Sequence, residues 1–78
     1  MSRFRIIGPV SNVEVIASGK GVKIRAYLNK KYGHGRWRKL KGDALVEFEN
    51  GEIRFAEIHW CEAHGIGMKE EKVKRVLR

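Results

Sequence analysis

The stretch DALVEFENGEIRFAEIHW, residues 43–60, contains the clearest folding signal in the chain. The dipeptide Asn-Gly at 50–51 stands between two runs in which apolar and polar residues alternate, and this combination is the strongest short-range signal for a β-hairpin. A two-residue loop would fix the register of the two strands and place Glu47 opposite Arg54, a favourable cross-strand pair. We therefore expect an antiparallel hairpin centred on residues 50–51.

The apolar positions of this hairpin switch from one alternation to the other along the strands. Near the turn the apolar set consists of Val46, Phe48, Ile53 and Phe55, and further away it consists of Leu45, Ala56, Ile58 and Trp60. Such a switch predicts either a β-bulge or a region of sheet that is covered on both faces.

Upstream of the hairpin, the period of the pattern changes in SGKGVKIRAYLNKKYG, residues 18–33. Apolar and aromatic residues recur at the spacing of one helix face, at Ile24, Tyr27, Leu28 and Tyr32. Ser18 is a candidate N-cap and Gly33 a candidate C-terminal stop. The pattern predicts an amphipathic helix over residues 20–32, with Tyr27 in its apolar stripe.

Two shorter segments complete the expected fold. Residues 4–7 and 10–17 are rich in Val and Ile and are separated by Gly-Pro, which is typical of one or two short strands. Residues 69–78 fit either a helix or a basic edge strand, and we favour a strand that completes the sheet. The sequence thus predicts an α+β domain, with one N-terminal amphipathic helix packed on a small antiparallel sheet of about four strands.

Length and cysteine content limit the class of protein. Seventy-eight residues provide one small domain, which we take to span residues 1–78, and a core this thin makes a homodimer plausible. Cys61 is the only cysteine, so an internal disulfide is excluded and a cytoplasmic location is favoured. No apolar run has the length of a membrane span, so we expect no membrane association.

The charges are segregated along the chain. The net charge is +8, and the 22 residues from Lys20 to Lys41 contain nine basic side chains and no acid. Such clustering attracts phosphate polyanions, which predicts binding of nucleic acid, with RNA or single-stranded DNA ahead of duplex DNA. A basic surface of this kind would also suit a small acidic protein partner.

The segment HGRWRKLKG, residues 34–42, places a tryptophan between cations, and single-stranded nucleic acid favours this composition because a base can stack on the ring. A packed core tryptophan is the alternative for Trp37. The residues that we expect to contact nucleic acid are Lys20, Lys23, Lys30, Lys31, Arg36, Trp37, Arg38, Lys39 and Lys41.

A second cluster, HWCEAHGIG at residues 59–67, contains residue types that can act as acids, bases or metal ligands. Ribonucleolytic cleavage needs a base, an acid and a cation on the phosphate, and the candidates are Glu62 and His64, with Arg54, Arg36 or Arg38 as the cation. A zinc site is a weaker alternative because there is no paired cysteine motif, and its candidate ligands are His59, Cys61 and His64, with His34 or Glu62 as the fourth. We expect no metal and no other cofactor, and the sequence leaves open whether the protein is an enzyme.

The stretches YGHGRWRKLKG and EIHWCEAHGIG together resemble sequences of short, functionally uncharacterised prokaryotic proteins, over residues from about 32 to 78. The resemblance implies a complete small protein and brings no activity and no site residue. The expected helix and antiparallel sheet are also compatible with small ribonuclease toxins of the RelE type, at the level of fold analogy alone, since no toxin motif matches residue by residue.

Overall fold

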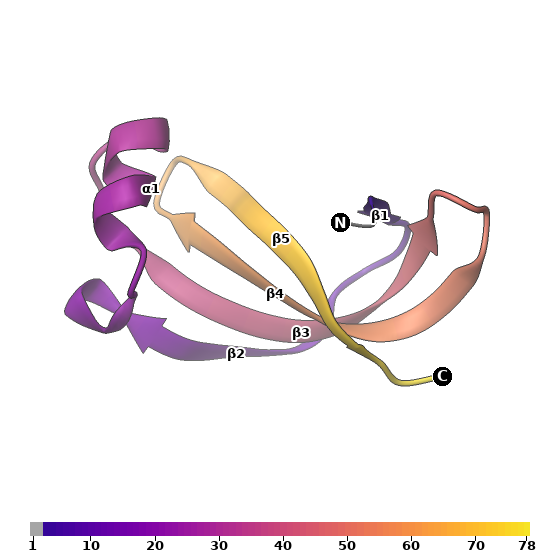
Figure 1. Ribbon diagram of the computed structural model, residues 1–78. Helices are drawn as coiled ribbons and strands as arrows, with labels where there is room; N and C mark the ends of the chain where they lie inside the picture. Colours follow the sequence, from indigo (N-terminus) through magenta and orange to yellow (C-terminus); the bar gives the residue numbers. More distant parts are fainter. Residues whose placement is uncertain (1–2) are drawn as a thin grey trace.

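The computed structural model describes residues 3–78 and shows a protein built mainly from antiparallel β-strands. Strands account for 57% of the residues and helical turns for 14%, so the predicted α+β class with an N-terminal amphipathic helix is wrong. The chain forms a strongly curved sheet that resembles half of a barrel, with one short helix at one end (Figure 1).

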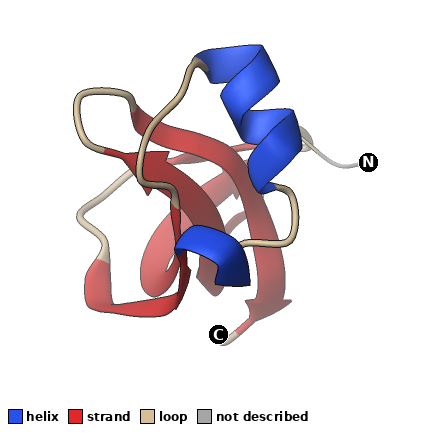
Figure 2. Cartoon of the chain, turned by 90° about the vertical axis from the view of Figure 1, so that its left-hand side faces the viewer, coloured by secondary structure: helices blue, strands red, loops and turns tan. Residues whose placement is uncertain are grey.

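The elements follow one another without long connections. The strands are β1 (Phe4–Ile6), β2 (Ser11–Ser18), β3 (Arg38–Phe48), β4 (Ile53–Ala63) and β5 (Gly67–Val76). A single 3-10 turn, η1 (Gly19–Gly21), and the helix α1 (Arg25–Tyr32) lie between β2 and β3. Figure 2 shows both helical segments at the same end of the curved sheet.

The long strand β3 organises the sheet. It pairs with β4 along one edge, while its other edge is shared by β1 near its C-terminal end and by β2 near its N-terminal end. Strand β5 pairs with β4 on the far side, which confirms the expectation of a C-terminal strand. Because β2 and β5 each pair on one side only within residues 3–78, the curved sheet does not close into a barrel.

The hairpin lies where the sequence predicted it, but its register is shifted by one residue. Glu47 pairs with Ile53, not with Arg54, and Phe48 N–H donates to Glu52 O across a three-residue loop. Gly51 adopts φ +87° inside this loop, and the chain forms a turn followed by a left-handed glycine instead of the two-residue turn. The predicted pair of Glu47 and Arg54 is therefore absent, and Glu47 binds Arg5 at 2.7 Å instead.

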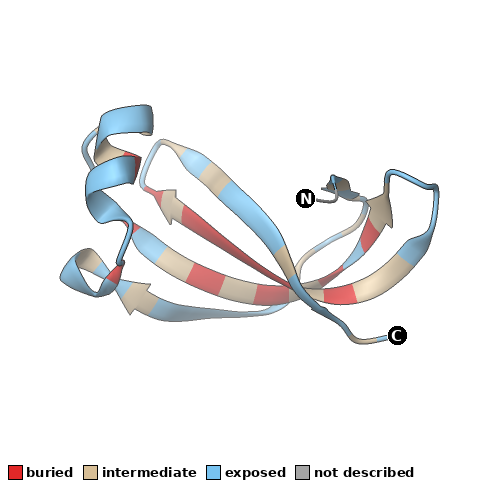
Figure 3. Cartoon of the chain, in the orientation of Figure 1, coloured by how far each residue is buried: buried red, intermediate tan, exposed pale blue. Residues whose placement is uncertain are grey.

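The two faces of the sheet are named here after neighbouring residues on β4. The Trp60 face carries the main core, which consists of Leu40, Ala44, Val46, Ala56, Ile58 and Trp60. The His59 face carries a second buried cluster near α1, which consists of Val22, Leu28, Trp37, Cys61 and Ala63. Four consecutive residues, 58–61, are consequently buried, as Figure 3 shows for β4. The switch in the apolar pattern marks a sheet covered on both faces.

The helix is shorter than predicted because its N-terminal part does not fold as a helix. Residues 19–21 form the 3-10 turn, Val22 is extended, and α1 begins at Arg25 without a side-chain cap at Ile24. Its end at Gly33 is as predicted, with Gly33 N–H bonded to Asn29 O. Leu28 is the only buried residue of the helix, so the predicted four-residue core stripe is wrong.

Candidate functional site

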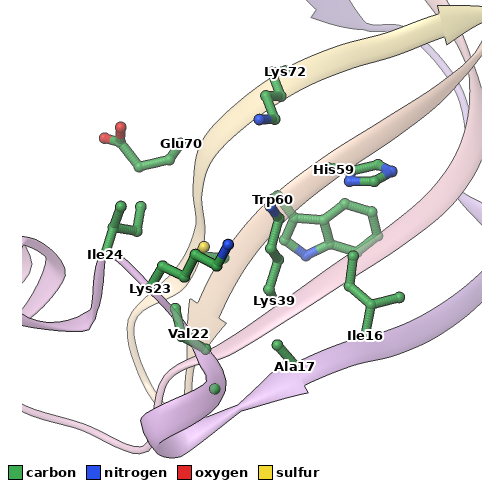
Figure 4. Close-up of a pocket in the computed structure, with 12 residues that line it drawn as sticks. Ile16, Ala17, Val22, Lys23, Ile24, Lys39, His59, Trp60, Glu70 and Lys72 are labelled. Atoms are coloured by element: carbon green, nitrogen blue, oxygen red, sulfur yellow. The ribbon is translucent and has the colours of Figure 1, made fainter.

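A cavity of about 440 Å³ opens on the His59 face, between β2, β5 and the segment that leads into α1. Its size is within the usual range for small-molecule pockets. Ile16 and Ala17 of β2, Val22 and Ile24 before the helix, and Cys61 of β4 provide an apolar lining. Its charged lining comes from Lys23, Lys39, Lys72 and Glu70, which lie around the opening in Figure 4.

Strand register explains why cations gather here. Lys72 of β5 is paired with His59, which is paired on its other side with Lys41 of β3. One pair further along, Cys61 stands between Lys39 and Lys69. Residues paired across strands point to the same face, so four lysines flank a central strip of β4.

Three of the basic side chains at the cavity have no acidic partner. Among the residues from 3 to 78, no ion pair is formed by Lys23, Lys39 or Lys72, whereas Lys41 lies 3.7 Å from Glu14. Figure 4 shows Lys23 extending from its loop toward Lys39, with Lys72 across the opening on β5. Uncompensated cations at one cavity make it attractive to anions.

His59 forms the floor of this cavity. The residue is 8% exposed, and its Nε2 lies 2.7 Å from Glu57 Oε2, while Arg75 Nε donates to the other Glu57 oxygen at 3.0 Å. Nδ1 is buried and has no hydrogen-bond partner among the described residues. A buried polar atom without a partner costs free energy, so the structure holds this ring nitrogen at a cost.

The hydrogen bond from His59, together with the one from Arg75, holds the pKa of Glu57 below its ordinary value. Glu57 is thus ionised at neutral pH and orients the imidazole through Nε2. When His59 is neutral with its proton on Nε2, Nδ1 can accept a hydrogen bond, and when His59 is protonated, Nδ1 can donate one to an anion.

Among residues 3–78, Glu70 is the only acid that lines the cavity, and its carboxylate is engaged elsewhere. Tyr32 donates its hydroxyl to Glu70 Oε2, and Lys31 Nζ lies 3.6 Å from the same oxygen. The hydrogen bond to Glu70 raises the pKa of the Tyr32 hydroxyl. In Figure 4 the carboxylate points away from Lys39 and Lys72, so it leaves the interior of the cavity to the cations.

Cys61 contributes no reactive group. Its side chain is 3% exposed, and burial raises the pKa of its thiol above the ordinary value of 9.0, although Lys39 and Lys72 act in the opposite direction. The thiol is therefore protonated at neutral pH and serves as a small packing residue beneath the cavity.

Trp37 does not occupy the position that base stacking requires, which corrects the prediction for this residue. Its side chain is completely buried, and its Nε1 donates to Asn29 Oδ1 at 2.9 Å. Its ring packs at a tilt against Tyr32, with 6.1 Å between the ring centroids. Trp37 is a core residue that attaches α1 to the sheet, the alternative that the sequence left open.

The other predicted contacts divide into three groups. Lys23 and Lys39 line the cavity, and Lys41 lies on the same sheet face. Lys31 and Arg38 are paired with acids, Arg38 at 2.9 Å from Glu62 on the Trp60 face. The remaining three residues are exposed and do not line the cavity: Lys20, Lys30 and Arg36. Because residues 38 and 39 point to opposite faces, the basic segment does not form one surface.

The structure does not bring together the catalytic candidates Glu62, His64 and Arg54. Glu62 accepts from Trp60 Nε1 at 2.8 Å and from Arg38 on the Trp60 face, and His64 is exposed in the turn after β4. Arg54 lies at the opposite end of β4 and donates to Arg78 O at 2.8 Å. Arg54 and Glu62 are eight positions apart on β4, about 26 Å along the strand at the usual rise. This arrangement cannot serve one scissile bond.

The zinc alternative also fails on geometry. His59 and Cys61 share one sheet face, but Glu62 projects from the other, and His64 lies beyond the end of the strand. Within residues 3–78, no group of three or more His, Cys, Asp and Glu side chains gathers in an arrangement that could hold a metal ion.

Sequence reasoning missed Lys69 and Lys72 as partners of the basic segment, and it missed the role of His59 in the cavity. The alternation of KEEKVKRV could have indicated a basic strand face, but the neighbour of β5 could not be deduced. A bulge between the pairs formed by His59 and Cys61 places Glu70 in a left-handed conformation, with φ +55°. The bulge changes the direction of the Glu70 side chain, and no simple sequence pattern predicts such a bulge.

Comparison of the chain with protein-family models, with curated proteins and with solved structures gives no match. In the part of the chain that the structure describes, no helix has the length and apolar character needed to cross a membrane.

Proposed function

We propose that this protein binds RNA or another single-stranded nucleic acid through the His59 face of its sheet. The observation that carries the proposal is the set of three lysines without acidic partners, Lys23, Lys39 and Lys72, around one cavity. They come from three separate segments of the chain, so the fold gathers charge that the sequence disperses.

The lysines of this face supply the affinity in the proposal. Ammonium groups neutralise backbone phosphates and release condensed counterions, which makes binding strong at low salt and weaker as salt rises. Lys39 and Lys72 stand on the two strands that flank β4, and Lys69 extends the basic surface along the sheet, whereas Lys41 is paired with Glu14 at 3.7 Å. A strand that follows this surface would meet a cation at each of these positions.

A single strand suits the site better than a duplex, because a cavity of about 440 Å³ can admit one nucleotide unit but not a stacked base pair. Tyr27 replaces Trp37 as the candidate stacking residue in the proposal. Tyr27 is 46% exposed and lies about one helical turn from Ile24, which lines the cavity. The earlier assignment of Tyr27 to the core stripe is wrong, since nearly half of the side chain is accessible.

Fluorescence anisotropy of labelled single-stranded RNA and duplex DNA tests the proposal. We expect RNA to bind more tightly than the duplex, and the double variant Lys39→Gln/Lys72→Gln to weaken RNA binding at least about tenfold, since charged hydrogen bonds contribute roughly 1.5–3 kcal/mol each. Arg3→Gln is the matched control, because Arg3 is exposed beside β1 at the other end of the sheet. Equal losses in the double variant and in the Arg3 control would refute the assignment of this face.

A further inference from the structure

The cavity on the His59 face carries more positive charge than one backbone phosphate requires. Three lysines and one glutamate line it, which leaves a net charge of +2 while His59 is neutral. A phosphodiester carries one negative charge, whereas a phosphate monoester carries about two at neutral pH because its second pKa is near 6. The charge of the cavity therefore matches a monoester better than a diester.

The position of His59 adds a second and independent observation. It is 92% buried on the floor of the cavity, and its Nδ1 has no partner among the residues from 3 to 78. Glu57 holds the opposite ring nitrogen at 2.7 Å, so the ring has a fixed orientation. Arg75 donates to the other Glu57 oxygen at 3.0 Å, so this carboxylate does not cancel the charge of the three lysines.

We propose that this cavity is a phosphate-monoester site, with Lys23, Lys39 and Lys72 binding the phosphate oxygens. This inference rests on the proposed function in one respect, the source of the monoester: the terminal phosphate of a nucleic-acid strand. A free nucleoside monophosphate has the same chemistry and would occupy the same cavity.

The surroundings of the cavity fit a terminal group. The lining comes from β2, β3, β4, β5 and the segment at residues 21–24, so the phosphate would enter from the open side. The apolar side chains of Ile16 and Ile24 stand in the same lining and offer a surface for the sugar or base of the end nucleotide. A monoester at the end of a strand would thus be bound in the cavity while the rest of the strand follows the lysines of the sheet.

Four labelled RNAs of one sequence test the proposal by anisotropy. One carries a 5′-phosphate, one a 3′-phosphate, one hydroxyl groups at both ends, and one is hydroxyl-ended but two nucleotides longer, so that its total charge equals that of the phosphorylated strands. We expect one of the two phosphorylated strands to bind at least about tenfold more tightly than both hydroxyl-ended strands, a difference of about 1.4 kcal/mol.

Variants assign that preference to the cavity. Lys72→Gln and Lys23→Gln change exposed residues that leave the core intact, and each should abolish most of the preference for the phosphorylated end. Arg3→Gln should retain it, with circular dichroism as the check on the folding of every variant. Retention of the full preference in the Lys72 and Lys23 variants would overturn the assignment to this cavity.

Competition with adenosine 5′-monophosphate against adenosine separates the two sources. If RNA binds but its end phosphate makes no difference and the monophosphate does not compete, the monoester site is refuted and the proposed function stands. If the monophosphate binds and no strand does, the monoester site stands and the proposed function is refuted. Absence of binding by either ligand refutes both.

Discussion

Replacement of Trp37 by phenylalanine separates a core role from a role in base stacking. The indole N–H donates to Asn29 Oδ1 at 2.9 Å and lies 3.3 Å from Gly33 O, and the ring is completely buried. Phenylalanine keeps an aromatic ring but removes this donor, which leaves the Asn29 carbonyl without its partner at a cost of about 1–3 kcal/mol. The smaller ring leaves a cavity of roughly 40 Å³, which adds about 1 kcal/mol.

The expected loss is therefore about 2–4 kcal/mol, out of a total stability of roughly 4–12 kcal/mol for a chain of this length. For a domain of this size the melting temperature should fall by about 10–25 °C. Thermal unfolding followed by circular dichroism measures this fall in melting temperature. Tyr27→Phe is the control. Because Tyr27 is exposed, this substitution should change the free energy of unfolding by less than about 0.5 kcal/mol.

Trp37→Phe should still bind RNA with wild-type affinity below its melting transition, because the ring at position 37 is buried and not available to a base. A melting temperature within about 3 °C of wild type, together with a loss of RNA affinity, would refute the assignment of Trp37 to the core.

Three further predictions concern stability and reactivity. Gly42→Ala should destabilise the protein by about 1–3 kcal/mol in urea unfolding, because the new Cβ would lie 2.6 Å from Val10 Cγ1. Gly8→Ala is the control and should not destabilise the protein, because nothing lies within 4 Å of its new Cβ. Equal effects of the two substitutions would contradict the packing around Gly42. Cys61 should react with a thiol reagent at least about a hundredfold more slowly in the folded protein than in urea, and equally fast reaction would show that the thiol is accessible. Because the pKa of Glu57 is lowered by His59 and Arg75, its carboxylate stabilises the folded state above the ordinary value of 4.5, and that contribution is lost as pH falls through the folded pKa. Glu57→Gln should thus lower the free energy of unfolding at about pH 6 and approach wild type at about pH 2, and a difference that is constant with pH would contradict this.

The position of the hairpin could be predicted from the sequence, but its register could not. The Asn-Gly dipeptide at 50–51 permits both a two-residue turn and a three-residue loop with a left-handed glycine, and the choice depends on strand pairing further along β3. Glu47 binds Arg5 of β1 in the folded protein, a long-range contact that the hairpin sequence does not contain.

The helix was overpredicted for a related reason. The spacing of Ile24, Leu28 and Tyr32 fits a helix face, yet Val22 is extended and packs with Leu28 and Cys61 on the sheet. The local spacing of apolar residues indicates only a propensity for helix. Tertiary packing determines how many of these residues are helical in the folded protein.

The candidate site depended most on information that the sequence lacks. Net charge and the basic segment at residues 20–41 indicated a cationic surface, but strand alternation placed Arg38 and Lys39 on opposite faces. Lys72 reached the cavity through pairing with His59, and neither residue appeared among the predicted contacts. Charges can be counted from a sequence, whereas the face on which each one lies follows from register.

The salt dependence of RNA binding tests the account of the His59 face most directly. The logarithm of the association constant should fall linearly with the logarithm of salt concentration, and Lys39→Gln and Lys72→Gln should each reduce the slope by about 0.7, the contribution of one phosphate contact with a single strand. Arg3→Gln should leave the slope unchanged. Slopes that stay the same in both lysine variants, or that fall equally in the Arg3 control, would contradict the assignment of phosphate binding to this face.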